Sequence, residues 1–237
     1  MAKLDAAAAG RLARGPLRKV AESLLERRSG AVYYGSMTGA HRIRDIAVLV
    51  GFALLLLAPG IAIRLGLLPF DLRFGVLIAV SVLCIGLCFL AGYRGAELGL
   101  AGPWVARHWL GCGLVTVLIG AAIYVEAQFL PAARRQPDWV RFAPFYVMIS
   151  SPCQELVFRS IPKLITDRLR LSGVKYMLFS AVTFSLMHIA YGDPLLLANT
   201  FVAGLAWAGA YLVTQNIWPI AASHAAVGSL AFWLGVA

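Results

Sequence analysis

The sequence is poor in charged residues, and poorest in acidic ones. Asp, Glu, Lys and Arg together make up 14% of the 237 residues, with 11 acidic residues against 21 basic ones. Hydrophobic residues make up 60%, whereas soluble domains contain roughly 45–50%. A chain with so few charges cannot cover a water-exposed surface, so we predict an integral membrane protein.

Several site signatures are also missing. No C-x-x-C spacing occurs, which argues against a zinc ribbon and a disulfide framework. No H-E-x-x-H pattern occurs among the four histidines, so we predict no metal site and no cofactor. The first 44 residues contain no apolar run of the kind that forms a signal peptide. We expect free thiols packed as small apolar side chains at the four cysteines, Cys84, Cys88, Cys112 and Cys153.

Long apolar stretches follow Asp45 and continue to the end of the chain. A membrane-crossing helix needs about 20 such residues. The pattern predicts an all-α, polytopic transmembrane helical bundle of about seven spans over residues 46–237, with the most informative motifs in 142–237. The predicted spans are roughly 46–69, 74–92, 107–130, 142–166, 174–192, 194–213 and 216–236.

Residues 1–45 form a basic arm, with an amphipathic helical pattern over residues 10–28. This helix could lie on an anionic lipid surface or pack as an ordinary helix against the bundle. With the arm in the cytoplasm, fifteen basic residues fall on that side and five on the other, because basic residues favour the cytoplasmic face. We therefore expect a cytoplasmic N-terminus, and seven spans would leave the C-terminus outside. The net charge of +10 then reflects membrane orientation, and we predict no nucleic-acid partner.

The fourth predicted span carries polar residues that are costly at membrane depth. Gln154 and Glu155 are followed by Arg159, and prolines at positions 152 and 162 flank this segment. Glu155 and Arg159 are four residues apart, so they share a helix face and can form an ion pair. Such a pair could be purely structural. Each proline removes a helix hydrogen bond, and broken helices at this depth are tolerated where they line a cavity.

Two later spans add Phe184 with His188 and, further on, His224. A single histidine on an apolar helix is usually a hydrogen-bonded core residue, but three polar motifs on three spans favour a shared cavity. A carboxylate and a neutral imidazole can activate water, and a second imidazole can stabilise an oxyanion. The same residues could instead hold zinc or build a proton relay of the kind found in transporters.

These segments resemble the CPBP family, which includes the CAAX prenyl proteases and the bacteriocin-processing (Abi) intramembrane proteases. The family pattern is E-E-x-x-x-R, then F-x-x-x-H, then H-x-x-x-N or H-x-x-x-D. The matching positions are Gln154 and Glu155 with Arg159, Phe184 with His188, and His224 with Gly228. The resemblance covers about residues 142–237.

The resemblance implies an all-helical membrane endopeptidase of the glutamic type. It implies that His188 shares in activating water, that His224 stabilises the oxyanion and that Arg159 organises the neighbouring carboxylate. The implied partners are the lipid bilayer and a membrane-associated protein or peptide substrate; the oligomeric state is not implied. Together with the Ala- and Arg-rich composition, it leads us to expect a bacterial inner membrane protein.

Two positions depart from the family pattern. Gln154 stands at the position of the catalytic base, and an amide cannot act as a general base. Gly228 stands where a side-chain donor is expected. Glu155 could serve as the base, with Ser229 or Asn199 supplying a donor. Alternatively, the chain is a catalytically inactive membrane scaffold or immunity protein, or Gln154 is an engineered replacement for Glu. We take the active endopeptidase, with Glu155 and His188 activating water, as the working prediction.

Overall fold

The computed structural model describes residues 39–102, 104–130 and 137–236. The chain divides into two units, Met1–Arg44 and Asp45–Ala237. The amphipathic stretch predicted at residues 10–28 lies outside the described residues. The second unit contains all the polar motifs singled out from the sequence, and its fold determines how they meet.

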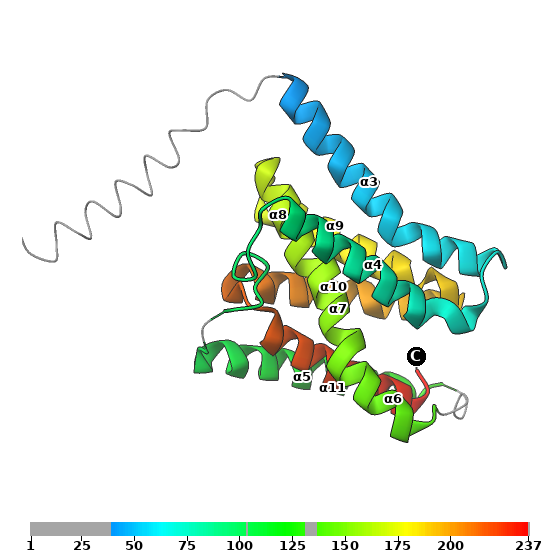
Figure 1. The fold of residues 1–237 in the computed structure, drawn as a ribbon. Coiled ribbons are helices and arrows are strands. Elements are labelled where there is room, and N and C mark those ends of the chain that lie inside the picture. The colour runs from blue at the N-terminus through cyan, green and yellow to red at the C-terminus, as the bar shows by residue number, and fades with distance from the viewer. Residues whose placement is uncertain (1–38, 103, 131–136, 237) are drawn as a thin grey trace, which may run out of the picture. The chain divides into compact units, whose positions relative to one another are not determined.

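Every regular element of the described residues is a helix, which confirms the all-α prediction (Figure 1). The first helices among the described residues are α3 (Gly39–Arg64), α4 (Arg73–Leu90), preceded by the short 3-10 helix η1 (Phe70–Leu72), and α5 (Ala106–Ala127). The last three are α9 (Gly173–Met187), extended by the 3-10 turn η4 (His188–Tyr191), α10 (Pro194–Thr214) and α11 (Ile217–Leu234).

Six helical stretches of the described residues are long and apolar enough to cross a membrane. They coincide with six of the seven predicted spans, and they cover 42–64, 70–90, 106–127, 173–191, 194–214 and 217–234. The remaining prediction, at 142–166, falls in a helical rod from Trp139 to Arg168 that is divided into five short elements. At about 1.5 Å per residue this rod is also long enough to span a bilayer.

The rod alternates between α- and π-helical geometry. Its elements are α6 (Trp139–Phe145), π-helix η2 (Tyr146–Ser150), α7 (Ser151–Glu155), π-helix η3 (Leu156–Ser160) and α8 (Ile161–Arg168). Each π-helical stretch ends just before a proline, Pro152 or Pro162. Proline lacks an amide hydrogen and crowds the carbonyl four residues back, so the chain widens there. Insertions of this kind are frequent at functional sites.

The middle of this rod forms the interior of the second unit. Segments α7 and η3 both contact α4 and α11, and η3 also contacts α9 and α10 (Figure 1). Helices α9 and α10 pack closely because Gly204 has no side chain; a Cβ there would lie 3.0 Å from the Cα of Ala181 and 3.4 Å from the Phe184 ring. This close approach fixes the positions of Phe184 and of His188, which follows one turn later.

Helix ends near the motifs are fixed by side-chain caps. Asp193 accepts from the amides of Leu195 and Leu196 at the start of α10, and Asn216 accepts from the amide of Trp218 at the start of α11. Between them, Gln215 adopts a left-handed conformation with φ of 45°. Gln215 and the Asn216 cap define the short connection between α10 and α11, which sets the register of His224.

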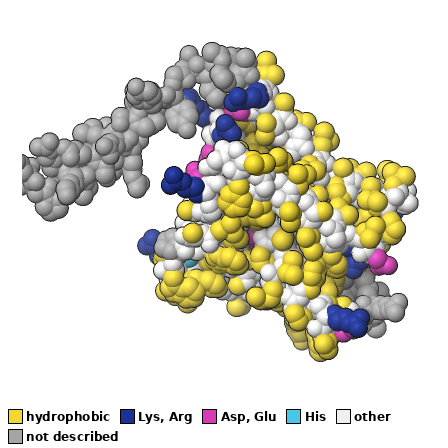
Figure 2. Space-filling view, viewed as in Figure 1, with side chains coloured by type: hydrophobic (Ala, Val, Ile, Leu, Met, Phe, Trp, Pro, Cys, Tyr) yellow, Lys and Arg dark blue, Asp and Glu magenta, His cyan; other side chains and the backbone are white. Residues whose placement is uncertain are grey.

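Apolar side chains cover most of the face shown in Figure 2. Many large hydrophobic residues are exposed on the helix surfaces, including Leu54, Leu87, Leu110 and Val117. An apolar surface of this extent requires a lipid environment rather than water. All four cysteines are free, and only Cys153 is partly exposed rather than buried, which confirms the prediction of unpaired thiols.

Candidate active site

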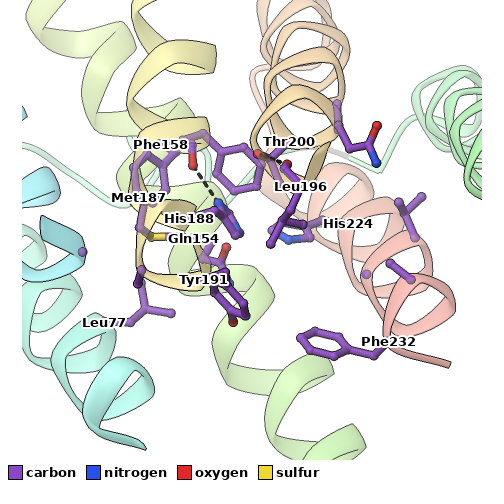
Figure 3. Close-up of a pocket in the computed structure, with 18 of the residues that line it drawn as sticks. Leu77, Gln154, Phe158, Met187, His188, Tyr191, Leu196, Thr200, His224 and Phe232 are labelled. Atoms are coloured by element: carbon purple, nitrogen blue, oxygen red, sulfur yellow. Dashed lines mark hydrogen bonds between the residues drawn. The ribbon is translucent and has the colours of Figure 1, made fainter. Parts of the chain in front are cut away.

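A cavity of about 420 Å³ lies among the helices of the second unit. This volume falls within the usual range for ligand pockets, roughly 300–1,000 Å³. Apolar side chains from α3, α4, α5, α9, α10 and α11 line most of it (Figure 3). The polar and titratable residues that line the cavity are Arg73, Glu126, Tyr146, Gln154, His188, Tyr191, Asn199, Thr200, Trp207 and His224.

Glu155 lies behind the cavity wall and does not line the cavity. Its side chain is fully buried, and its two carboxylate oxygens face different partners. One oxygen, Oε2, lies 3.1 Å from Nε of Arg159. The other, Oε1, accepts a hydrogen bond of 2.6 Å from Nδ1 of His224. From the sequence we expected Glu155 to share the hollow with the histidines, but the structure places it one layer further in.

The guanidinium of Arg159 is fully buried as well. Its Nη1 donates to Ser180 at 2.8 Å and to the carbonyl of Phe158 at 3.3 Å. The guanidinium carbon lies 4.6 Å from the centroid of the Phe184 ring, a cation–π contact. Removing a charge from water costs several kcal/mol, and these neighbours offset part of that cost for the Glu155–Arg159 pair.

His224 is fixed on both sides of its ring. Its Nδ1 is committed to Glu155, and the imidazole stacks on Trp207 with the ring centroids 4.5 Å apart at 20°. The edge of Phe184 packs against it at 5.4 Å. A carboxylate can only accept, so Nδ1 carries the hydrogen, and Nε2 is the ring nitrogen available to the cavity. His224 is only 3% exposed, so this orientation is strongly constrained.

His188 is oriented by its own helix. Its Nδ1 lies 2.8 Å from the carbonyl oxygen of Phe184, one turn earlier, where α9 tightens into the 3-10 turn η4. Because a carbonyl can only accept, Nδ1 donates, and Nε2 of the neutral ring is a free acceptor. Figure 3 shows His188 and His224 projecting from different helices toward the same space.

Gln154, unlike its neighbour Glu155, lines the cavity. Successive helical residues point about 100° apart, which explains why the two side chains separate. The amide nitrogen of Gln154 donates to Ser150 at 2.9 Å. Its Oε1 is buried and has no hydrogen-bond partner among the described residues. This oxygen is therefore an acceptor in need of a donor, such as a water or a peptide N–H.

Neither of the two alternative donors considered from the sequence is positioned as expected. Asn199 lines the cavity, but its amide nitrogen donates to both carboxylate oxygens of Glu126, at 2.9 and 2.8 Å. Ser229 does not line the cavity. Gly228 does line it, one helical turn after His224, and the phenol of Tyr146 packs against it. Sequence reasoning missed Tyr146, since an aromatic residue in an apolar span carries no signal by itself.

Within residues 39–102, 104–130 and 137–236, no group of three or more His, Cys, Asp or Glu residues is arranged to hold a metal ion. What the cavity offers instead is a set of fixed donors and acceptors in an apolar surrounding. A neutral imidazole nitrogen, a second imidazole paired with a carboxylate, an amide oxygen and a phenol converge there. Such an arrangement can polarise water and stabilise a developing negative charge.

Residues 136–230 match a protein-family model described as type II CAAX prenyl endopeptidase Rce1-like. The match covers all three polar motifs and confirms the family resemblance inferred from the sequence. A search of curated proteins and a search of solved structures each found no match.

Proposed function

We propose that this chain, which is similar to the Rce1-like endopeptidases over residues 136–230, is an intramembrane endopeptidase that hydrolyses a peptide bond of a membrane-associated protein or peptide. Water activated by side chains, rather than by a metal ion, supplies the nucleophile in this proposal. The observation that carries it is that His188 and His224, each fixed through Nδ1, line one apolar cavity.

We assign His188 as the general base. Its Nδ1 partner is a neutral carbonyl rather than a carboxylate, and Nε2 of the neutral ring can take a proton from water. The unpaired Oε1 of Gln154 is suited to accept the second hydrogen of that water and so to orient it. The water oxygen then attacks the carbonyl carbon of the substrate, and the protonated His188 returns the proton to the leaving amine.

We assign His224 to the oxyanion. A carboxylate on Nδ1 stabilises a charged imidazole, and in the imidazolium form both nitrogens donate: Nδ1 to Glu155 and Nε2 to the substrate oxygen. Glu155 then acts as the positioning residue for His224, and not as the residue that activates water. Arg159 and Phe184 support the pair from behind. This differs from the expectation that Glu155 itself acts on the water, because Glu155 is sealed off from the cavity.

The lining of the cavity indicates the class of substrate. Most of its wall consists of aliphatic and aromatic side chains, so an apolar or lipid-modified peptide segment would be favoured over a charged one. For location, we propose a bacterial inner membrane with the N-terminus in the cytoplasm. Basic residues are in excess in the arm and in the loops predicted to lie on the same side of the membrane, which supports this orientation.

The decisive experiment uses the purified full-length protein reconstituted in phospholipid vesicles. The probes are peptides ending in a prenylated cysteine followed by three residues, with the unprenylated peptides alongside, and mass spectrometry identifies the products. We expect cleavage by the wild-type chain and none by His188→Ala or His224→Ala. Equal processing by wild type and both variants, or no processing of any probe by wild type, would overturn the proposal.

One observation favours a second candidate function, a catalytically inactive membrane scaffold. Gln154 lines the cavity where the family pattern has a glutamate, and an amide cannot take a proton from water. A scaffold would retain partner binding in the His188→Ala and His224→Ala variants while showing no processing in any form. The effect of restoring a carboxylate at position 154 separates these two functions.

A further inference from the structure

The side chain of Tyr146 and the missing side chain of Gly228 are complementary. A Cβ placed on Gly228 would overlap the phenolic oxygen of Tyr146 and would lie 2.7 Å from its Cζ and 2.8 Å from its Cε1. No residue with a side chain fits at position 228 while the phenol stays in place. The hydroxyl of Tyr146, on η2, therefore occupies the space that a side chain of residue 228, on α11, would otherwise take.

The phenol of Tyr146 is held firmly in that place. Its ring stacks on Phe142 at 5.1 Å and 17°, and it packs edge-on against Phe232 at 5.6 Å. Tyr146 is 5% exposed and lines the cavity. Its position at the start of a π-helical stretch, six residues before Pro152, depends on the widened backbone of the rod.

Tyr146 also lies next to His224. The two ring centroids are 6.0 Å apart at 82°, and Gly228 follows His224 by one helical turn on the same face of α11. A phenol is a neutral hydrogen-bond donor that keeps its proton at working pH. The two other donors considered for this role are less suited to it, because the amide nitrogen of Asn199 already donates to Glu126 and Ser229 does not line the cavity.

We infer that Tyr146 is a catalytic residue that donates its hydroxyl hydrogen to the oxyanion beside His224, taking the place of a side chain at position 228. The inference rests on the proposed peptide hydrolysis. When water adds to the carbonyl carbon, the electron pair of the C=O bond moves to oxygen, and that oxygen accepts hydrogen bonds from Tyr146 Oη and His224 Nε2. No proton leaves Tyr146, and the bonds to oxygen weaken again when the C–N bond breaks.

The test compares Tyr146→Phe with wild type in the vesicle cleavage assay. Loss of one oxyanion donor lowers kcat by roughly 100- to 1,000-fold, and KM should change little because the bond forms mainly in the transition state. The matched control is Tyr211→Phe, which also removes a buried phenol but lies outside the cavity lining. We expect this control to keep the wild-type kcat.

A second pair of variants tests the complementarity itself. Tyr146→Ala opens space beside α11, and adding Gly228→Asn places a side-chain donor in that space. We expect the double variant to have a higher kcat than Tyr146→Ala alone. Thermal unfolding in detergent shows whether each variant is folded.

The outcomes separate this inference from the proposed function. If the wild type cleaves the peptide and Tyr146→Phe has the same kcat, the catalytic role of Tyr146 is overturned and the proposed function stands. Tyr146→Phe and Tyr211→Phe could instead lose kcat equally and both unfold at lower temperatures. That result would give the Tyr146 phenol a structural role and would also overturn its catalytic role. Absence of cleavage by wild type overturns both.

Discussion

Oε1 of Glu155 and Nδ1 of His224 lie 2.6 Å apart, although 69 residues separate them in the sequence. The contact joins the central rod to the last helix, and the same carboxylate contacts Arg159 through its other oxygen. The buried carboxylate of Glu155 therefore connects the buried guanidinium of Arg159 to the imidazole of His224 at the cavity wall. The predictions below follow from this chain of contacts.

Replacing Glu155 with Gln removes the negative charge but keeps the shape of the side chain. An amide cannot stabilise an imidazolium as a carboxylate does, so we expect kcat to fall by roughly 100-fold or more with KM little changed. Cleavage kinetics in vesicles provide the measurement. Glu97→Gln is a matched control, because Glu97 is exposed and its carboxylate accepts from the amide of Arg94, three residues earlier. Wild-type kcat in Glu155→Gln would contradict the positioning role.

Arg159→Met leaves the Glu155 charge buried and without its cation. Breaking a buried pair from one side costs about 3–5 kcal/mol of folding stability. We expect a clear drop in the unfolding temperature, measured in detergent. The double variant Glu155→Gln with Arg159→Met should recover part of that loss, since it leaves no unpaired charge in the interior. If the single variant unfolded at the wild-type temperature, the pair would not contribute to stability.

Gln154→Glu introduces a carboxylate that lines the cavity, whereas Glu155 does not. A carboxylate placed beside the attacking water is a better proton acceptor than an amide, and general-base catalysis is worth roughly 100- to 10,000-fold. We expect kcat to rise in this variant, with the product unchanged by mass spectrometry. Activity that appears only after this change would identify the wild-type chain as the inactive scaffold.

Chelators should leave cleavage unaffected. The proposed roles all belong to side chains, with His188 taking the proton and His224 and Tyr146 donating to the oxyanion. Vesicles are preincubated with 1,10-phenanthroline or EDTA, and the initial rate is compared with that of untreated vesicles. A loss of activity that added zinc restores would show that a metal ion takes part, and would replace the proposed mechanism.

How far the sequence could predict this site differs from residue to residue. Glu155 and Arg159 could be paired from their four-residue spacing alone, because helix geometry is local. The chemistry of His188 and His224 could be anticipated from residue type. Their common cavity could only be hypothesised, because it depends on how α9 and α11 pack against the rod. The broken geometry near Pro152 and Pro162 was also predictable, since proline acts on its own helix.

The long apolar runs by themselves determined that this is an all-helical membrane protein, because a run of about 20 apolar residues matches a membrane-crossing helix and is too long for a barrel strand. The sequence also pointed to Glu155, His188 and His224 as candidate site residues, because ionisable groups at membrane depth are rare. Only the tertiary structure decided that Gln154 faces the cavity while Glu155 is sealed behind His224, and that Tyr146 fills the space left by Gly228. These relationships depend on the rotation of one helix against another, and that rotation is set by packing among residues far apart in the chain.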